Sequence, residues 1–373
     1  MIKAAISGTG LYTPPETISN EELVEAFNQY VANFNEEHAS DISDGIVEPL
    51  QASSAAFIEK ASGIKNRRVI NKSGILDPAR MRPYIAERSD DEPSVQCDMA
   101  VSAAKEALEQ AGKSVADIDA VIIACSNMPR AYPALSVEVQ SRLGIEGFAY
   151  DMNVACSSAT FGLQAAVNAV ENGTARAVLV ISPEICSAHL NFKDRDSHFI
   201  FGDACTAIVV EQMDSVTSQH VYEVVGTKLK TVFSNNIRNN FGFLNRCDES
   251  GEGKSDKLFV QQGRKVFKDV VPMVSAIIGE HLKENALSPE SLKRMWLHQA
   301  NLSMNKLISK KVLGREPSSL EAPVILDEYA NTSSAGSIIA FHKHKSDFQK
   351  GDIGVICSFG AGYSVGSVLL RKC

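Results

Sequence analysis

Strand-like and helix-like segments alternate along the middle of the chain. Residues 120–125 (AVIIAC) are apolar at every position, which is typical of a strand covered on both faces of a sheet. A helix-like segment follows at 158–171, and another strand-like run, RAVLVIS, at 176–182. This alternation predicts an α/β architecture.

A further helix is predicted just before this alternation. In SVQCDMAVSAAKEALEQAG, apolar side chains recur at helical spacing and Gly112 stands where the helix would end. The apolar stripe consists of Val95, Met99, Ala103, Ala107 and Ala111. Residues 35–49 and 71–93 are instead rich in charged residues, glycine and proline, and we expect them to be surface excursions.

The order of features in the first half of the chain returns in the second half. A strand-like run, a glycine, a polar turn and another strand-like run occur at 120–125, Gly144, Cys156 and 176–182. The same succession is found at 294–298, Gly314, Asn331 and 354–359. Such a repeat predicts two copies of one structural unit. We expect a pseudo-twofold axis to bring Cys156 and Asn331 close to His298, which ends a strand of the second copy.

Composition and charge exclude several classes of protein. The 373 residues are 44% hydrophobic and 22% charged, as in an ordinary globular protein. The formal net charge of −8 gives no general attraction for nucleic acid or an anionic membrane, and neither is expected as a partner. The first residues, MIKAAISGTGLYTPP, resemble neither a secretory signal nor a membrane span, so we expect a cytoplasmic protein.

The cysteines provide the first indication of the chemistry. The eight cysteines are scattered, without CxxC spacing or a cluster with histidine, so neither a metal site nor a disulfide framework is expected. Cys156, in DMNVACSSATFGLQAA, could be a buried packing residue. Its small neighbours and its place before a helix, where N–H groups and the helix dipole favour a thiolate, instead indicate a nucleophile.

His298, Asn331 and the run FGAGYSVGS at 359–367 each have two interpretations. His298 follows an apolar strand, where α/β proteins present active groups, but it could be a core or capping histidine. Asn331 could serve only as a helix N-cap. The glycine-bearing run could be a tight turn. It lacks the spacing of a phosphate loop or a dinucleotide site, and its functional interpretation is an oxyanion hole.

Four segments, in this order, resemble the β-ketoacyl-acyl carrier protein synthase III family of the thiolase superfold. They are ACSSATFG, LHQANLS, YANTSSAG and FGAGYSVGSVLL. The resemblance runs nearly the length of the chain and implies a homodimer with a five-layered αβαβα fold. It further implies two thiolase-like halves, residues 1–215 with the nucleophile and residues 216–373 with the histidine and asparagine.

The resemblance also implies roles for particular residues. The catalytic triad would be Cys156, His298 and Asn331, and the N–H groups of Cys156 and Ala361 would form the oxyanion hole. Residues implied for coenzyme A and its pantetheine arm are Phe57, Arg195, Arg264, Phe267 and Asn301. Those implied for the acyl pocket are Phe359 and Tyr132. Of these, Tyr132 would cross the dimer interface and close the acyl pocket of the partner subunit.

The sequence departs from the family pattern near the substrate entrance. Phe57 and Ala61 stand where the family has tryptophan and arginine, and Ser303 replaces an arginine that helps to dock the carrier protein. A basic face formed by Arg264, Lys265 and Lys268 could be solvated surface or could dock an acidic carrier.

The implied reaction transfers an acyl group from acyl-CoA to Cys156 and condenses it with malonyl-acyl carrier protein. Decarboxylation generates the carbanion, so N–H donors from a neutral His298 and from Asn331 suffice to stabilise the enolate. No tightly bound cofactor is expected. The altered entrance predicts a primer longer than acetyl.

Three alternatives remain open on the sequence alone, and a thiolase is disfavoured. A type III polyketide synthase shares the EYxNxSSA pattern around Asn331. A cysteine hydrolase shares the order Cys, His, Asn, and a non-catalytic thiolase-fold subunit shares the fold. A thiolase needs a second cysteine as base, and Cys357 lies one residue too early for that role.

Overall fold

The computed structural model describes residues 2–89, 91–239, 247, 249–251 and 253–373. Its largest element is a nine-stranded sheet with the order β11-β12-β13-β8-β1-β7-β6-β4-β5, and β2 with β3 and β9 with β10 form two small sheets. The strands are β1 (Ala4–Tyr12), β2 (Glu16–Ser19), β3 (Asn66–Val69), β4 (Ala120–Ala124), β5 (Phe148–Met152), β6 (Ala177–Ile185), β7 (Asp203–Gln212), β8 (Tyr222–Ser234), β9 (Ile237–Arg238), β10 (Val260–Gln261), β11 (Leu292–Leu297), β12 (Ile353–Gly360) and β13 (Gly362–Lys372).

The large sheet consists of two similar halves. In one half, β4 is parallel to β5 and β6, and β7 is antiparallel to both β6 and β1. In the other half, β11 and β12 are parallel, and β13 is antiparallel to both β12 and β8. The halves meet where β1 pairs with β8, at Ala5 with Glu223 and Ile6 with Tyr222. The strand pairing therefore repeats, as the repeat in the sequence predicts.

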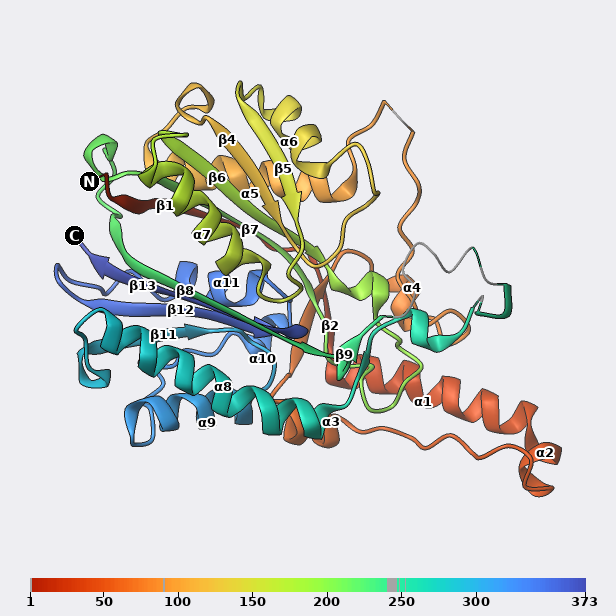
Figure 1. The fold of residues 1–373 in the computed structure, drawn as a ribbon. Helices are drawn as coiled ribbons and strands as arrows, with labels where there is room; N and C mark the ends of the chain where they lie inside the picture. The colour runs from red at the N-terminus through yellow and green to blue at the C-terminus, as the bar shows by residue number, and fades with distance from the viewer. Residues whose placement is uncertain (1, 90, 240–246, 248, 252) are drawn as a thin grey trace.

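Helices lie outside and between the two half-sheets (Figure 1). The helices are α1 (Asn20–Glu37), α2 (Ala39–Ser43), α3 (Ala55–Ser62), α4 (Ser73–Leu76), α5 (Val95–Ala111), α6 (Leu135–Leu143), α7 (Ser158–Glu171), α8 (Gly263–Glu284), α9 (Leu302–Leu313), α10 (Leu326–Tyr329) and α11 (Ala335–Lys343). α7 and α11 pack with strand residues of both halves, including Ile122 and Trp296. α5 and α6 cover one outer face, and α8 and α9 cover the other. The predicted five-layered αβαβα fold is confirmed.

The elements predicted from hydrophobic patterns lie close to their expected places. The strand expected at 120–125 is β4, the helix expected at 158–171 is α7, and the strand expected at 176–182 is the longer β6. The alanine-rich stripe is the buried face of α5, which ends at Gly112 with a φ of 64°. Since positive φ values are unfavourable for residues with a Cβ, glycine suits this helix end.

The first polar excursion forms an arm that extends from the body (Figure 1). The end of α1 and the short helix α2 make its outward part, and the chain returns beside α1. Two reciprocal pairs of hydrogen bonds hold the return segment, one between Asn28 and Ser53 and one between Asn35 and Leu50. The second excursion contains α4, and its residue 90 lies outside the described residues. Within the described ranges, no helix has the length and apolarity that crossing a membrane requires.

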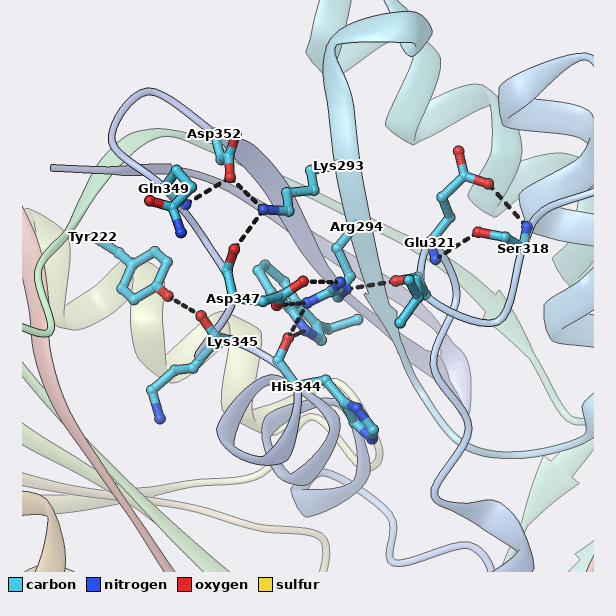
Figure 2. A network of polar contacts seen from close by, with 12 residues as sticks. Tyr222, Lys293, Arg294, Ser318, Glu321, His344, Lys345, Asp347, Gln349 and Asp352 are labelled. Carbon is cyan, nitrogen blue, oxygen red and sulfur yellow. Dashed lines mark hydrogen bonds and ion pairs between the residues drawn. The ribbon is translucent and has the colours of Figure 1, made fainter.

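A polar network anchors the beginning of β11 (Figure 2). The buried Arg294 donates to both carboxylate oxygens of Asp347, at 2.5 and 2.9 Å, and to the carbonyls of Leu320 and His344 at 2.5 and 2.6 Å. Lys293 donates to Asp352 at 2.5 Å. These contacts fix the strand that ends just before His298.

Candidate active site

Cys156 lies between the end of β5 and the start of α7. The residue before it, Ala155, has a φ of 47°, a strained value for alanine that turns the chain sharply into the helix. Gly360, at the end of β12, faces the sulfur. A Cβ on Gly360 would lie 2.6 Å from Cys156 Cβ and 3.0 Å from its Sγ, so only glycine leaves room for the thiol there.

The surroundings of Cys156 favour the thiol over the thiolate. Burial raises the pKa of Cys156 to about 11. The hydroxyl of Ser333 acts to lower this pKa, the charge of Glu184 raises it, and the backbone N–H groups of Ala361 and Cys156 lower it. The expectation of a thiolate at the helix N-terminus was therefore wrong, because loss of solvation outweighs the nearby donors.

His298 is the first residue after β11 and is 2% exposed. Its backbone N–H donates to the carbonyl of Cys357 at 2.8 Å, and its ring meets the edge of Phe359 with centroids 5.2 Å apart. Burial lowers the pKa of His298 to about 4, and the backbone of Ser333 acts in the opposite direction. The imidazole is therefore neutral at physiological pH. Among the described residues its Nδ1 has no hydrogen-bond partner.

Asn331 lies in the turn between α10 and α11. Its backbone N–H donates to Ile200 and its carbonyl accepts from Gly202, at 3.0 and 3.1 Å. Its side-chain Oδ1 accepts from the N–H of Ser333 at 2.9 Å, which leaves the NH₂ group as the donating end of the amide. Because α11 has Ser334 as its N-cap residue, the interpretation of Asn331 as a helix cap was wrong.

Ser333 connects all three of these residues and was missed in the sequence. Its hydroxyl donates to Cys156 Sγ at 3.5 Å, its N–H holds the Asn331 side chain, and its backbone acts on the His298 ring. Ser333 has a φ of 49°, an unusual conformation that marks a constrained turn. The run ANTSSAGS carried the signal, but serines beside an expected helix start are common.

The site residues meet in one cavity of about 280 Å³. Six of the predicted site residues line it: Cys156, Phe267, His298, Asn301, Asn331 and Phe359. The remaining wall is mostly apolar, with contributions from Phe201, Val266 and Met304. No group of His, Cys, Asp and Glu side chains within the described ranges could hold a metal ion.

Phe57 and Arg195 lie together beside this cavity. The Arg195 guanidinium is 4.5 Å from the centre of the Phe57 ring, and its Nε donates to the carbonyl of Ala52 at 2.8 Å. Phe57 also meets the edge of Phe199, which lines the cavity, with centroids 5.8 Å apart. One face of the Phe57 ring, which is expected to contact coenzyme A, is thus covered by arginine.

Asn301 already has partners at both ends of its amide. Its NH₂ donates to the carbonyl of Ala61 at 2.7 Å, and its Oδ1 caps α9 by accepting from Ser303 and Met304. Arg264 is exposed on the first turn of α8, next to Gly263, which lines the cavity. Asn301 lines the cavity, whereas Arg264 only adjoins a residue that does. Asn301 must keep its cap if it contacts a substrate.

Tyr132 is not part of the cavity that contains Cys156. It is 84% exposed, in the loop between β4 and α6, and borders a separate hollow of about 1140 Å³. The single chain therefore does not bring Tyr132 to the other predicted site residues.

Comparison with known proteins agrees with this fold and site. Residues 150–231 match the family described as 3-oxoacyl-[acyl-carrier-protein] synthase III, and residues 282–372 match its C-terminal part. A β-ketodecanoyl-[acyl-carrier-protein] synthase of Pseudomonas aeruginosa is 66% identical over 94% of this chain and all of the relative. A β-ketoacyl-[acyl-carrier-protein] synthase III of Ehrlichia canis is 29% identical over the full length of both chains.

A solved structure gives the same result. The 3-oxoacyl-[acyl-carrier-protein] synthase III of Aquifex aeolicus superimposes with a TM-score of 0.75 at 25% identity, over 100% of both chains. Fold and cavity together define a thiolase-fold condensing enzyme, which is an acyltransferase. The chain belongs to the 3-oxoacyl-[acyl-carrier-protein] synthase III family, and the predicted condensing activity in fatty acid biosynthesis is confirmed.

Proposed function

We propose that the enzyme takes an eight-carbon acyl group from acyl-CoA onto Cys156 and condenses it with malonyl-acyl carrier protein. The observation that carries the proposal is that Cys156, His298 and Asn331 line one cavity. The products are β-ketodecanoyl-acyl carrier protein, carbon dioxide and free CoA.

In the loading step the sulfur of Cys156 attacks the thioester carbonyl of the acyl-CoA. The N–H groups of Cys156 and Ala361, which already act on the sulfur, donate hydrogen bonds to the oxyanion. Because the resting thiol is protonated, its proton leaves as the carbon–sulfur bond forms. The neutral His298, which lines the same cavity, takes this proton. When the carbonyl re-forms, the bond to the CoA sulfur breaks and His298 passes the proton to the leaving CoA thiolate. His298 is then neutral again for the condensing step.

In the condensing step the malonyl thioester loses carbon dioxide and its enolate attacks the acyl group on Cys156. An enolate oxygen needs hydrogen-bond donors, and a neutral imidazole can supply one. Two observations support this role: burial keeps the pKa of His298 at about 4, and the Asn331 amide has its Oδ1 engaged, so that its NH₂ remains to donate.

The proposed primer length is supported by the relative at 66% identity, whose name gives a β-ketodecanoyl product. Ten acyl carbons, less the two that a malonyl unit contributes after decarboxylation, leave eight. The apolar cavity wall, with Phe201, Val266 and Met304, is compatible with an aliphatic chain. A medium-chain primer also agrees with the departures at Phe57 and Ala61.

A panel of acyl-CoA primers from two to twelve carbons tests this proposal. Each is incubated with enzyme and malonyl-acyl carrier protein, and the products are measured by mass spectrometry. We expect the highest kcat/KM with octanoyl-CoA, and an adduct on the peptide that contains Cys156. Highest activity with acetyl-CoA would contradict the primer assignment, and an adduct elsewhere would contradict the nucleophile. A parallel arm with malonyl-CoA shows whether the carrier is required.

The remaining assignments belong to the same proposal. Arg264, Lys265 and Lys268 are exposed beside the cavity, and their charge suits an acidic carrier protein. Phe57 and Arg195 would receive the nucleotide end of CoA. We further propose a cytoplasmic enzyme that needs no tightly bound cofactor.

A homodimer is the proposed assembly. Aromatic side chains are exposed near the sheet edge formed by β5, including Tyr132 at 84%, Phe148 at 40% and Tyr150 at 39%. Exposed apolar groups at an edge strand favour association with another chain. In such a dimer Tyr132 would reach the partner subunit's acyl pocket.

A further inference from the structure

Glu184, near the end of β6, is a buried carboxylate that no step of the proposed reaction uses. Its exposed fraction is 0%. Its Oε1 accepts from the backbone N–H groups of Ser126 and Ser334, at 3.0 and 3.2 Å, and from the hydroxyl of Ser334. Its Oε2 accepts from the hydroxyl of Ser126 at 2.6 Å. A buried charge is retained only where donors satisfy it, and here serine residues do so.

These donors come from opposite halves of the fold. Ser126 follows β4, whereas Ser334 ends the turn between α10 and α11. The Ser334 hydroxyl also lies 3.2 Å from the carbonyl of Ala124. Glu184 therefore ties the turn that carries Asn331 to the body of the first half-sheet.

The turn needs support from outside itself. Ala330 and Ser333 have φ values of 56° and 49°, and backbone in this region persists only where neighbouring contacts impose it. Ser333 in turn contacts Cys156 and holds the Asn331 side chain. A small displacement of the turn would move both contacts at once.

We propose that Glu184 is a positioning residue which, through Ser334, holds the Asn331 amide and the Ser333 hydroxyl in place relative to Cys156. The inference rests on the roles given to Cys156 and Asn331 under the proposed function. It makes the condensing step, which uses Asn331, more sensitive to Glu184 than the loading step.

Two serine variants separate positioning from general stability. Ser334→Ala removes the hydroxyl that links Glu184 to the turn, and Ser126→Ala removes the corresponding hydroxyl on the side of the body. Loading is measured as single-turnover acylation of Cys156 by mass spectrometry. Condensing is measured as carbon dioxide release from malonyl-acyl carrier protein by enzyme that has already been acylated.

For Ser334→Ala we expect kcat of the condensing step to fall at least about tenfold, as when an oriented donor is lost, with KM for malonyl-acyl carrier protein unchanged. Loading should fall less than condensing, because it loses only the contact of Ser333 with Cys156. Ser126→Ala should retain both steps. Glu184→Asp, whose carboxylate is withdrawn from the turn, should resemble Ser334→Ala, and Glu184→Gln, which keeps the side-chain length, should partly restore the condensing step.

Asn331→Ala in the same assays separates the role of Asn331 in condensation from the role of Glu184 in positioning it. If Asn331→Ala condenses normally, the proposed role of Asn331 is wrong. If Asn331→Ala loses condensation while folded Ser334→Ala and Glu184→Asp retain it, the proposed function stands and the inference about Glu184 is overturned. The inference is also overturned if Ser334→Ala and Ser126→Ala each lose loading and condensing to the same extent. That result would indicate that the serines only stabilise the fold.

Discussion

The chemistry of Cys156 is set by a competition between burial and nearby donors. Burial raises the pKa of the thiol to about 11, against the hydroxyl of Ser333 and the N–H groups of Ala361 and Cys156. Nucleophilic attack must therefore be coupled to loss of the thiol proton, since little thiolate exists beforehand. His298, neutral because burial lowers its pKa to about 4, is the complementary group.

Alkylation of Cys156 should reveal this raised pKa. The rate of reaction with iodoacetamide is followed by mass spectrometry on the peptide that contains Cys156. This rate should rise about tenfold per pH unit from pH 7 to 9, because the fraction of thiolate rises by the same factor. Ser333→Ala should slow the reaction, since the Ser333 hydroxyl acts to lower the pKa. If the rate stops rising before the pH reaches 8, the pKa of Cys156 is not raised and the prediction is contradicted.

The sequence predicted the reactive residues of the site but missed the residues that hold them in position. Cys156, His298 and Asn331 were recognisable because the repeat places them at corresponding strand ends and turns. Ser333 and Glu184 were not, because their importance depends on contacts made across 177 and 150 residues of the chain, to Cys156 and Ser334. A serine or a glutamate in an apolar strand gives no local indication of such a partner.

Among the elements, β11 presents His298 at one end and is anchored at the other. The buried Arg294 holds Asp347 through two hydrogen bonds and also binds the carbonyls of Leu320 and His344. Breaking this anchor would leave a buried guanidinium with unsatisfied donors.

Asp347→Asn should lower the free energy of unfolding by about 1–2 kcal/mol at pH 7, a value reduced for the partial exposure of Asp347. The hydrogen bonds from Arg294 hold the pKa of Asp347 at about 2. A lowered folded-state pKa contributes stability above the unfolded pKa, and that contribution disappears as the pH falls through the folded value. Denaturant unfolding should therefore show the difference between wild type and variant shrinking between about pH 4 and pH 2.

Glu316→Gln is the matched control for this prediction. Glu316 pairs with Lys310 at 2.5 Å, but the two side chains are 70% and 52% exposed. An exposed pair contributes little, so the loss should stay below about 0.5 kcal/mol. Equal losses for the two variants would contradict the importance of the buried Arg294.

Elements with a strong local pattern were predictable, and those defined by distant packing were not. The helix at 158–171 and the strand at 120–125 follow from their own residues. α1 extends to Glu37, into a segment that its charges marked as an excursion. Its buried residues, such as Phe27, pack in a cluster that includes Phe192 and Phe199 from far along the chain.

The whole molecule is held together by its central helical layer. Apolar residues of α7 and α11 form one cluster with strands of both halves, from Ile122 in β4 to Val368 in β13. The division at residues 215 and 216 stays a prediction, but neither side of it contains the whole of this cluster. A shared core of this kind favours joint unfolding.

We therefore expect the two halves to unfold in one transition. Trp296, the single tryptophan, reports on the second half by fluorescence. The buried thiols of Cys125 and Cys205 report on the first half by pulse labelling. The two probes should give the same denaturant midpoint, and separate midpoints would contradict a shared core.

The protonated resting state of Cys156 also affects how readily its sulfur is oxidised between turnovers. Peroxides attack thiolates far faster than thiols, and damage proceeds from sulfenic to irreversible acids. A protonated sulfur, half-buried between Gly360 and Ser333, presents little of the reactive form. Protection from oxidation is thus a by-product of the same desolvation that makes the nucleophile dependent on its histidine.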